Sequence, residues 1–283
     1  MRNIKLTIEY DGTNYNGWQS QKNGNTVEDM VREAIYLLTG EKVDVIGSGR
    51  TDSGVHAYGQ VANFYTQSSI PADKFSFALS SKLPCDIVIR ESVEVGSDFH
   101  ARFSAKGKKY RYLLYNSPHP SALLRNRTYH VFYNLNIEAM KEASCFFLGT
   151  HDFVGFMAKG SNVKTTVRTI KEINVRRQSP ILTVDEQSPI FIEKQSTITA
   201  GGQSPITTSG LSHMQKENGL IQIEITGDGF LYNMVRIIVG TLIEVGIGKL
   251  KSGDIKNIIE SCNRVNAGRT VPACGLYLVE VYY

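Results

Sequence analysis

The stretch GSGRTDSGVHA, residues 47–57, brings together an arginine, an aspartate and a histidine, which are residue types that can do chemistry. Glycine and aspartate would suit a simple turn, because glycine tolerates positive φ and aspartate hydrogen-bonds its own backbone. A turn does not need Arg50 beside Asp52. An aspartate carboxylate can act as a nucleophile or base, and a guanidinium can contact an anion or fill the space of an extruded base. The residues alone fit such a site or an Asx turn beside a surface arginine.

Asp52 and His56 are also of types that share a metal ion or act as an acid-base pair. They lie four residues apart, but the glycines of this stretch do not place both side chains on one face, and the chain has no HxH or HExxH cluster. His56 is therefore expected to be structural, and no metal site is expected. The chain also lacks the G-x-S-x-G elbow of serine hydrolases and the G-x-x-x-x-G-K-[ST] phosphate loop, so these two classes are excluded.

Residues 101–127 form a basic segment that contains no acidic residue. Its basic residues are Arg102, Lys106, Lys108, Lys109, Arg111, Arg125 and Arg127, and Tyr110, Tyr112 and Tyr115 lie among them. Basic side chains interleaved with aromatic ones suit phosphate contact together with packing on bases or sugars. The expected contacts to an RNA backbone are Arg102, Lys108, Lys109 and Arg111. A solvated strand face with tyrosines in the core explains the pattern equally well.

The composition is that of an ordinary soluble globular protein, with 41% hydrophobic and 20% charged residues in a chain of 283. The formal charge is +4, and the pI of about 8.7 is only mildly basic. The first residues alternate as a strand does and lack a secretory signal, while the apolar region 236–248 is too short and too charged to span a bilayer. The four cysteines form no CxxC pair. We expect a cytoplasmic protein with reduced thiols and no membrane association.

The candidate residues would be positioned by two similar α/β halves. In the first half, strands are expected at 3–10, 43–47, 59–65 and 86–95 and helices at 26–39, capped by Thr26, and 71–82. In the second half, strands are expected at 107–116, 166–176, 219–226 and 275–282 and helices at 137–148, 229–246 and 252–263. The order predicts an α+β fold of two tandem ferredoxin-like (split β-α-β) halves, residues 1–105 and 106–283. Antiparallel sheets would carry helices on one face, with an active-site cleft between the halves.

Residues 178–216 interrupt the pattern of the second half. Gln-Ser recurs at positions 178, 187, 195 and 203, and the segment has few large apolar residues. The period fits a strand plus a turn, and the segment lacks the basic surplus that would suit nucleic acid. We interpret it as a peripheral insertion in a hairpin turn, of natural or engineered origin, because GLSHMQ at 210–215 is similar to a cloning junction.

Several blocks of sequence follow one another in an order typical of one enzyme family. They are YDGTNYNGWQSQ (10–21), TVEDMVREAI (26–35), GSGRTDSGVHAYGQVANF (47–64), FHARFSAKGKKYRYLLYN (99–116), GTHDF (149–153), GDGFLYNMVRIIVGTLIEVG (227–246) and PACGLYL (272–278). Together they resemble the tRNA pseudouridine synthase A family. The resemblance covers nearly the whole chain except residues 178–216, where the family's hairpin is normally short.

The resemblance implies a role for four residues. Asp52 is similar to the family's catalytic aspartate, Arg50 to the arginine that takes the place of the flipped uridine, and Tyr110 to the tyrosine that packs on the target base. Arg236 is similar to the arginine that pairs with this aspartate, and such a pair would keep Asp52 ionised. On a helical wheel Arg236 lies opposite the apolar stripe of its helix, so periodicity alone predicts a solvated charge.

The implied activity is that of an isomerase, which converts uridine to pseudouridine at positions 38, 39 and 40 in the anticodon arm of tRNA. The N1–C1′ bond breaks, the uracil turns within the pocket and C5 joins C1′, which needs neither a metal nor an organic cofactor. The family is homodimeric, with tRNA lying across both subunits. Two other hypotheses stay open: a catalytically silent tRNA-binding module, and a metal hydrolase that uses Asp52 and His56.

Overall fold

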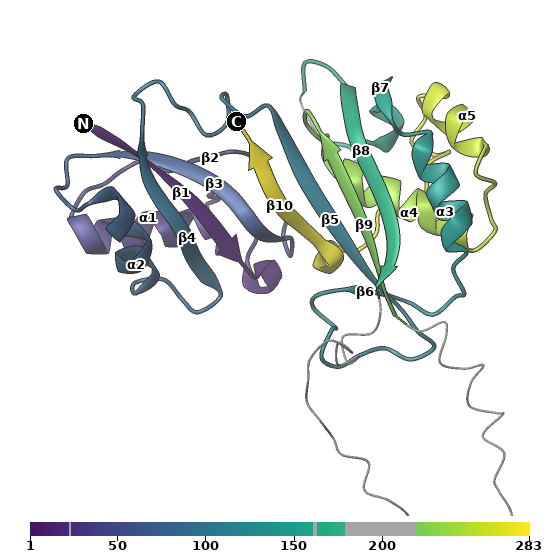
Figure 1. Cartoon of the computed structure of the whole chain (residues 1–283), viewed down its shortest axis with the longest axis horizontal. Helices are drawn as coiled ribbons and strands as arrows, with labels where there is room; N and C mark the ends of the chain where they lie inside the picture. The colour runs from purple at the N-terminus through teal and green to yellow at the C-terminus, as the bar shows by residue number, and fades with distance from the viewer. Residues whose placement is uncertain (23, 161–162, 179–218) are drawn as a thin grey trace, which may run out of the picture.

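The computed structural model describes residues 1–22, 24–160, 163–178 and 219–283. Within these residues the chain forms one continuous, mostly antiparallel sheet of ten strands, with helices packed against it (Figure 1). The strands lie in the order β4-β1-β3-β10-β5-β9-β8-β7, while β2 pairs with β3 and β6 pairs with β5. The expected mixed α+β architecture is thereby confirmed.

The bounds of the elements follow most of the expected ranges closely. The strands are β1 (Arg2–Tyr10), β2 (Ile46–Gly47), β3 (His56–Thr66), β4 (Ile87–Val95), β5 (Gly107–Asn116), β6 (Tyr129–Val131), β7 (Gly149–Asp152), β8 (Val167–Gln178), β9 (Gly219–Gly227) and β10 (Leu276–Tyr282). The helices are α1 (Val27–Thr39), α2 (Phe75–Ser80), α3 (Ile137–Cys145), α4 (Met234–Gly246) and α5 (Asp254–Glu260). The first half therefore has the predicted β-α-β-β-α-β order.

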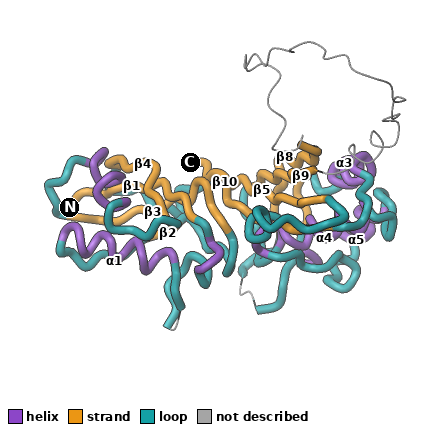
Figure 2. Tube along the Cα trace, turned by 90° about the horizontal axis from the view of Figure 1, so that it is seen from below, coloured by secondary structure: helices purple, strands orange, loops and turns teal. Residues whose placement is uncertain are grey.

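Helix α1 forms where a capping residue precedes an apolar stripe. The Thr26 hydroxyl accepts a hydrogen bond from the Asp29 amide at 3.3 Å, which satisfies a free N–H at the start of the helix. Val31 and Ile35, one turn apart, are fully buried against the sheet. In Figure 2, α1 lies on the same side of the sheet as α4 and α5. Alternate side chains of β1, such as Leu6 and Ile8, are fully buried, as expected for a strand with one covered face.

Several expected boundaries are wrong for local reasons. The helix expected at 229–246 begins only at Met234, because Asn233 adopts a left-handed φ of +62° that separates the preceding turn from the helix. The helix expected at 71–82 contains a 3-10 turn over residues 72–74 before α2. The strand expected at 43–47 is reduced to the two residues of β2. Strands β6 and β7 are too short to produce a periodic pattern, so nothing in the sequence indicated them.

Strand β10, close to the C-terminus, joins the two halves of the sheet. It lies parallel to β3, where Tyr277 is opposite His56, and antiparallel to β5 on its other side. The sheet therefore passes through the whole molecule without a break (Figure 1). The division into ferredoxin-like halves at residues 1–105 and 106–283 stays a prediction.

Strand β5 supplies side chains to both faces of this sheet. Tyr110 is buried on the helix-covered face, and Lys108 shares that face because side chains alternate along a strand. Lys109 and Arg111 point to the opposite face, where both form ion pairs with Glu224 of β9. One short basic segment thus serves two separate surfaces.

The proposed insertion at 178–216 lies, apart from Gln178, outside the described residues. Its flanking strands are adjacent, because Gln178 at the end of β8 is opposite Leu220 near the start of β9. No helix in the described part of the chain is long and apolar enough to cross a membrane.

Candidate active site

Hydrogen bonds from the sheet hold the loop of residues 48–55, which joins β2 to β3. Gln60 Nε2 donates to the carbonyl of Gly49 at 3.0 Å. Thr51 Oγ1 lies 2.8 Å from the hydroxyl oxygen of Tyr10, and both side chains are buried. Despite its glycines, this loop is therefore held in one conformation, which is what a reactive side chain requires.

The glycines at positions 47, 49 and 54, in and beside the loop, are required for different physical reasons. A Cβ at Gly47 would lie 2.2 Å from the indole nitrogen of Trp18, and a Cβ at Gly49 would lie 2.1 Å from the Lys108 ammonium. These two positions are small because a side chain packs directly against them. Gly54 is different, since its φ of +78° is a conformation that residues with a side chain rarely adopt. Two of these glycines are thus explained by close packing and one by the turn.

The loop presents Asp52 to the N-terminal end of α4. Arg236 Nη1 lies 3.2 Å from Asp52 Oδ2, although the two residues are 184 positions apart in the chain. The guanidinium is held in place by the carbonyl of Val271, at 2.7 Å from Nε, and by Asn233 Oδ1, at 2.6 Å from Nη1. The prediction from periodicity that Arg236 is a solvated charge is wrong, because only 17% of its side chain is exposed. The structure thus brings together the two residues that the sequence analysis paired by resemblance.

The electrostatics of Asp52 result from two opposing effects. Burial raises the pKa of its carboxyl above the usual value, and the Arg236 guanidinium lowers it by a smaller amount. Arg236 therefore favours the ionised form, as expected, without outweighing burial. Asp52 takes up a proton at a higher pH than an exposed aspartate does.

Tyr110 forms one wall beside Asp52. Burial, together with the nearby Asp52 charge, raises the pKa of its phenol well above the usual value, so the phenol stays neutral. The Phe230 ring packs edge-on against the Tyr110 ring, with centroids 5.1 Å apart, and fixes its orientation. Arg50, two residues before Asp52, is exposed and has no hydrogen bond or ion pair with any residue that the structure describes. Its guanidinium is free to contact a ligand.

The expected phosphate contacts differ in their surroundings. Lys108 lies beneath the loop, where its ammonium donates to the carbonyl of Ser48 at 3.0 Å and burial lowers its pKa to about 8. Lys109 and Arg111 share Glu224, at 3.4 Å and 2.8 Å, on the opposite face of the sheet. Phosphate contact by these residues stays a prediction, and only Lys108 among these three lies on the side of Asp52.

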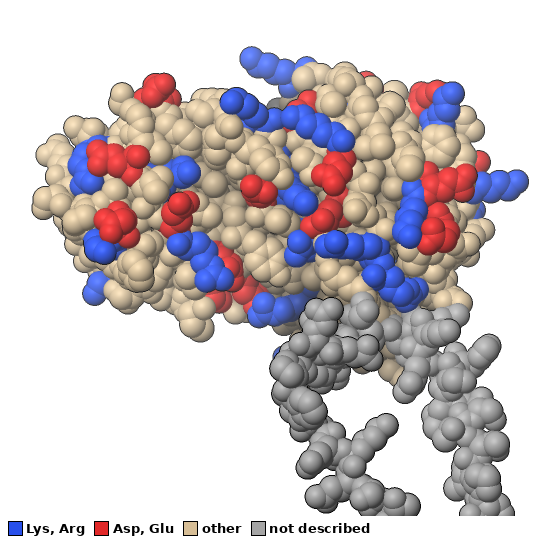
Figure 3. All heavy atoms as spheres, viewed as in Figure 1, with Lys and Arg blue, Asp and Glu red and all other residues tan. Residues whose placement is uncertain are grey.

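Arg102 is exposed, with its guanidinium 5.8 Å from the centre of the Phe103 ring. It contributes to the positive potential around Lys108, because its charge lowers the pKa of that lysine. Figure 3 shows a face of the molecule on which basic and acidic side chains are intermixed over most of the area, with a run of basic side chains along its lower edge.

His56 is not a partner of Asp52. Its side chain is 1% exposed, and its two ring nitrogens contact the backbone of Gly12 and Cys274. Within the described ranges, no group of three or more His, Cys, Asp or Glu side chains is arranged to hold a metal ion. His56 therefore has a structural role beside the loop, where it binds backbone groups.

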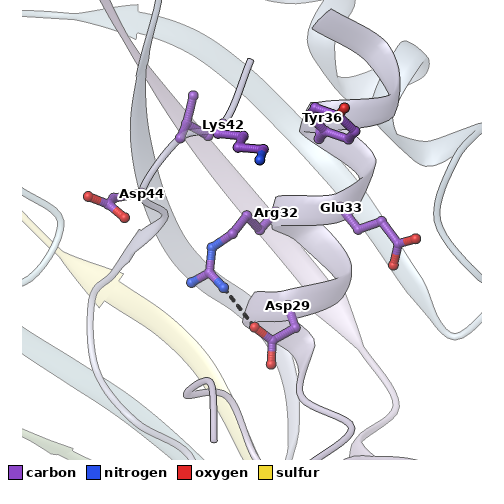
Figure 4. A pocket seen from close by; sticks show the side chains of 7 residues that line it. Asp29, Arg32, Glu33, Tyr36, Lys42 and Asp44 are labelled. Atoms are coloured by element: carbon purple, nitrogen blue, oxygen red, sulfur yellow. Dashed lines mark hydrogen bonds and ion pairs between the residues drawn. The ribbon is translucent and has the colours of Figure 1, made fainter. Parts of the chain in front are cut away.

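One surface hollow lies away from these residues. It has a volume of about 480 Å³ and is lined by side chains of α1 and of the segment that follows it. Figure 4 shows Arg32 directed toward Asp29 there, with Lys42 and Asp44 across the hollow. A second hollow of about 270 Å³ lies beside Tyr58 and Val279. Neither of these two hollows is lined by Asp52.

Two parts of the site were missed from the sequence, namely Asn233 and the segment 271–275. Asn233 both starts α4 with its positive φ and binds Arg236, and the backbone carbonyl of Val271 holds the same guanidinium. Every residue has a backbone carbonyl, so the residue type does not reveal which carbonyl will accept a hydrogen bond from Arg236. Both parts nevertheless lie in or beside the quoted blocks 227–246 and 272–278, which mark the neighbourhood.

Comparison with known proteins gives one consistent result. The sequence model described as tRNA pseudouridine synthase matches residues 6–104 and 143–283. The chain is 56% identical over 283 residues to "tRNA pseudouridine synthase A" of Acetivibrio thermocellus and 51% identical to the protein of that name from Ruminiclostridium cellulolyticum. It is 48% identical to "tRNA pseudouridine synthase A 2" of Clostridium perfringens. In each case the whole of both chains is covered.

Proposed function

The chain belongs to the tRNA pseudouridine synthase family, and from this premise we propose that Asp52 is the catalytic carboxylate of an isomerase acting on uridine in tRNA. We propose further that its targets are positions 38, 39 and 40 in the anticodon arm. The observation that carries the proposal is the Asp52–Arg236 ion pair, formed at 3.2 Å by a loop that is hydrogen-bonded to the sheet.

The isomerisation balances without any other reactant. The N1–C1′ glycosidic bond breaks, a C5–C1′ bond forms, the proton on C5 is lost and N1 gains a proton. The ionised Asp52 attacks the sugar, attacks C6 of the base or removes a sugar proton, and each route requires the carboxylate form. Arg236 supports that form, and the neutral Tyr110 offers a flat, partly apolar surface on which a uracil ring can turn.

Arg50 is proposed to occupy the space that the extruded uridine leaves. Flipping a base out of a stacked helix costs a few kcal/mol, which a guanidinium can offset by stacking and by contact with phosphate. Arg50 is exposed and makes no hydrogen bond within the described residues, so no existing contact must break first.

The phosphate contacts are proposed to centre on Lys108 and Arg102, which lie on the side of the loop. The Lys108 side chain is largely buried, and its ammonium donates a hydrogen bond to the carbonyl of Ser48. Among the described residues, no carboxylate forms an ion pair with this ammonium. Lys109 and Arg111 would reach only RNA that passes over the opposite face, where Glu224 already neutralises part of their charge.

The experiment that tests the proposal is release of tritium from C5-labelled uridine in tRNA lacking pseudouridine. Wild type should release tritium, while Asp52→Asn and Asp52→Ala should release none and still bind tRNA with nearly unchanged affinity. Asp44→Asn, an exposed aspartate before the same loop, is the matched control. If the wild type binds tRNA without releasing tritium, the chain is a silent tRNA-binding module, and if excess chelator stops the reaction, a metal hydrolase hypothesis gains support.

We also propose that the enzyme works in the cytoplasm as a homodimer of chains with two ferredoxin-like halves, with tRNA lying across both subunits. Sedimentation of the purified protein with and without tRNA tests this arrangement. A protein that sediments as a monomer in both conditions contradicts it.

A further inference from the structure

His56 is buried where three backbone segments meet. The Gly12 amide donates to its Nδ1 at 3.1 Å, and its Nε2 lies 3.2 Å from the carbonyl oxygen of Cys274. The imidazole ring stacks on Tyr277, with ring centroids 4.7 Å apart and planes inclined by 22°. These contacts fix both the position of the ring and its rotation.

The hydrogen bonds assign a tautomer to His56. Burial lowers the pKa of the imidazole more than the neighbouring Asp11 raises it, so the ring is neutral at neutral pH. The carbonyl oxygen of Cys274 can only accept, so Nε2 carries a proton and donates to it, while Nδ1 lies within hydrogen-bond distance of both a donor, the Gly12 amide, and an acceptor, Asp11 Oδ1. Asp11 Oδ1, 3.0 Å from Nδ1, is held by the Thr13 amide and hydroxyl, while its other oxygen pairs with Arg127.

The two segments that His56 joins hold the two ends of the Asp52–Arg236 ion pair. Asp52 lies four residues before His56 in the chain. Arg236 donates to the carbonyl of Val271, three residues before Cys274. Segment 271–275 is also close to the loop, because a Cβ at Gly54 would lie 3.4 Å from the Cβ of Ala273.

We propose that His56 is a positioning residue, which fixes the separation of Asp52 from Arg236 by hydrogen-bonding the Asp52 loop to segment 271–275. The inference rests on the proposed function, because it assigns His56 a part in the reaction of Asp52. The imidazole is 1% exposed and does not touch RNA, so it acts on the reaction only through this separation. An error of about 1 Å in a catalytic geometry lowers a rate by up to about 100-fold.

Two amide substitutions test the two hydrogen bonds of His56 one at a time. His56→Gln places its amide nitrogen near the position of Nε2 and keeps the donor to Cys274, whereas His56→Asn keeps an acceptor near Nδ1 for Gly12 and loses that donor. We expect His56→Gln to retain most of kcat. His56→Asn and His56→Phe should lose kcat by about 10- to 100-fold, with KM for tRNA changed by less than about 2-fold.

The matched control is His130→Asn, which removes a histidine contact to the carbonyl of Ser117 outside the loop. It should lower the melting temperature without lowering kcat. In the double variant His56→Asn/Arg236→Met, the loss of kcat should be no greater than in Arg236→Met alone, because both substitutions disturb one ion pair.

The outcomes distinguish the inference from the proposed function. A wild type that releases no tritium overturns the proposed function itself. With an active wild type, equal kcat values in His56→Gln and His56→Asn, or additive losses with Arg236→Met, overturn the positioning role of His56 alone. Thermal melts of every variant identify unfolding. If kcat falls in proportion to the melting temperature in every variant, His130→Asn included, that result also counts against the positioning role.

Discussion

The ion pair between Asp52 and Arg236 should determine how the activity depends on pH. Arg236→Met keeps most of the side-chain volume but removes the charge that offsets the burial of Asp52. Two unit charges 3.2 Å apart attract by about 5 kcal/mol at an effective dielectric constant near 20. Because 27% of Asp52 and 17% of Arg236 is exposed, solvent screening reduces this to about half, roughly 2.5 kcal/mol. Loss of that attraction shifts the balance of Asp52 toward the protonated form.

The sign of the effect follows from the form that reacts. Removing a positive neighbour raises the pKa of Asp52 further, so the carboxylate is lost at a higher pH than in the wild type. The acid limb of kcat/KM in the tritium-release assay should therefore move toward neutral pH in Arg236→Met, and activity should recover on the alkaline side. Arg236→Lys keeps the charge and should move the limb less.

The control for this series is Arg168→Met, a half-buried arginine that donates to the carbonyls of Thr165 and Val167. Its pH profile should match that of the wild type. If Arg236→Met lowers the rate equally at every pH, the guanidinium does not act through the ionisation of Asp52, and the reasoning is refuted.

Three further predictions concern the support of the site. Gly47→Ala should destabilise the fold by about 1–3 kcal/mol in urea titrations, because its Cβ meets the packed ring of Trp18, whereas Gly49→Ala should cost less, since the Lys108 ammonium can move aside; equal losses would contradict this. Lys108→Met should reduce the salt dependence of tRNA binding by about one unit of slope, and Lys109→Met by less, because Glu224 already pairs with Lys109. Equal reductions in filter binding would indicate RNA on both faces of the sheet. Replacing residues 179–218 by Asn-Gly should leave kcat within about 2-fold, because Gln178 and Leu220 are opposite one another and a short hairpin loop can join β8 to β9. Loss of turnover in a folded variant would give the segment a function.

Much of the fold follows from local pattern, because the strongest signals are alternation and caps. The range 107–116 was expected as a strand and is β5 to the residue, and Thr26 caps α1 as predicted. The boundary of α4 could not be predicted in the same way. Its start depends on a positive φ at Asn233, which the fold stabilises and which periodicity does not encode.

The site was less predictable than the fold because its contacts are long-range. A helical wheel considers Arg236 within its own helix, while its partner Asp52 comes from a loop in the other half of the chain. For the basic segment, in contrast, the sequence was sufficient. Neighbouring residues of a strand face opposite sides of the sheet, so the strand expected at 107–116 already predicts that Lys108 and Lys109 lie on different faces. The resemblance identified Asp52, and the structure adds what holds it in place.

The central claim is that Asp52 carries the reaction, and tritium release by wild type and Asp52→Asn on tRNA lacking pseudouridine tests it most directly. The substitution keeps the size of the side chain and removes only the ionisable group. We predict release by the wild type and none by Asp52→Asn, with tRNA binding retained. Turnover by Asp52→Asn at a rate near that of the wild type would contradict the claim.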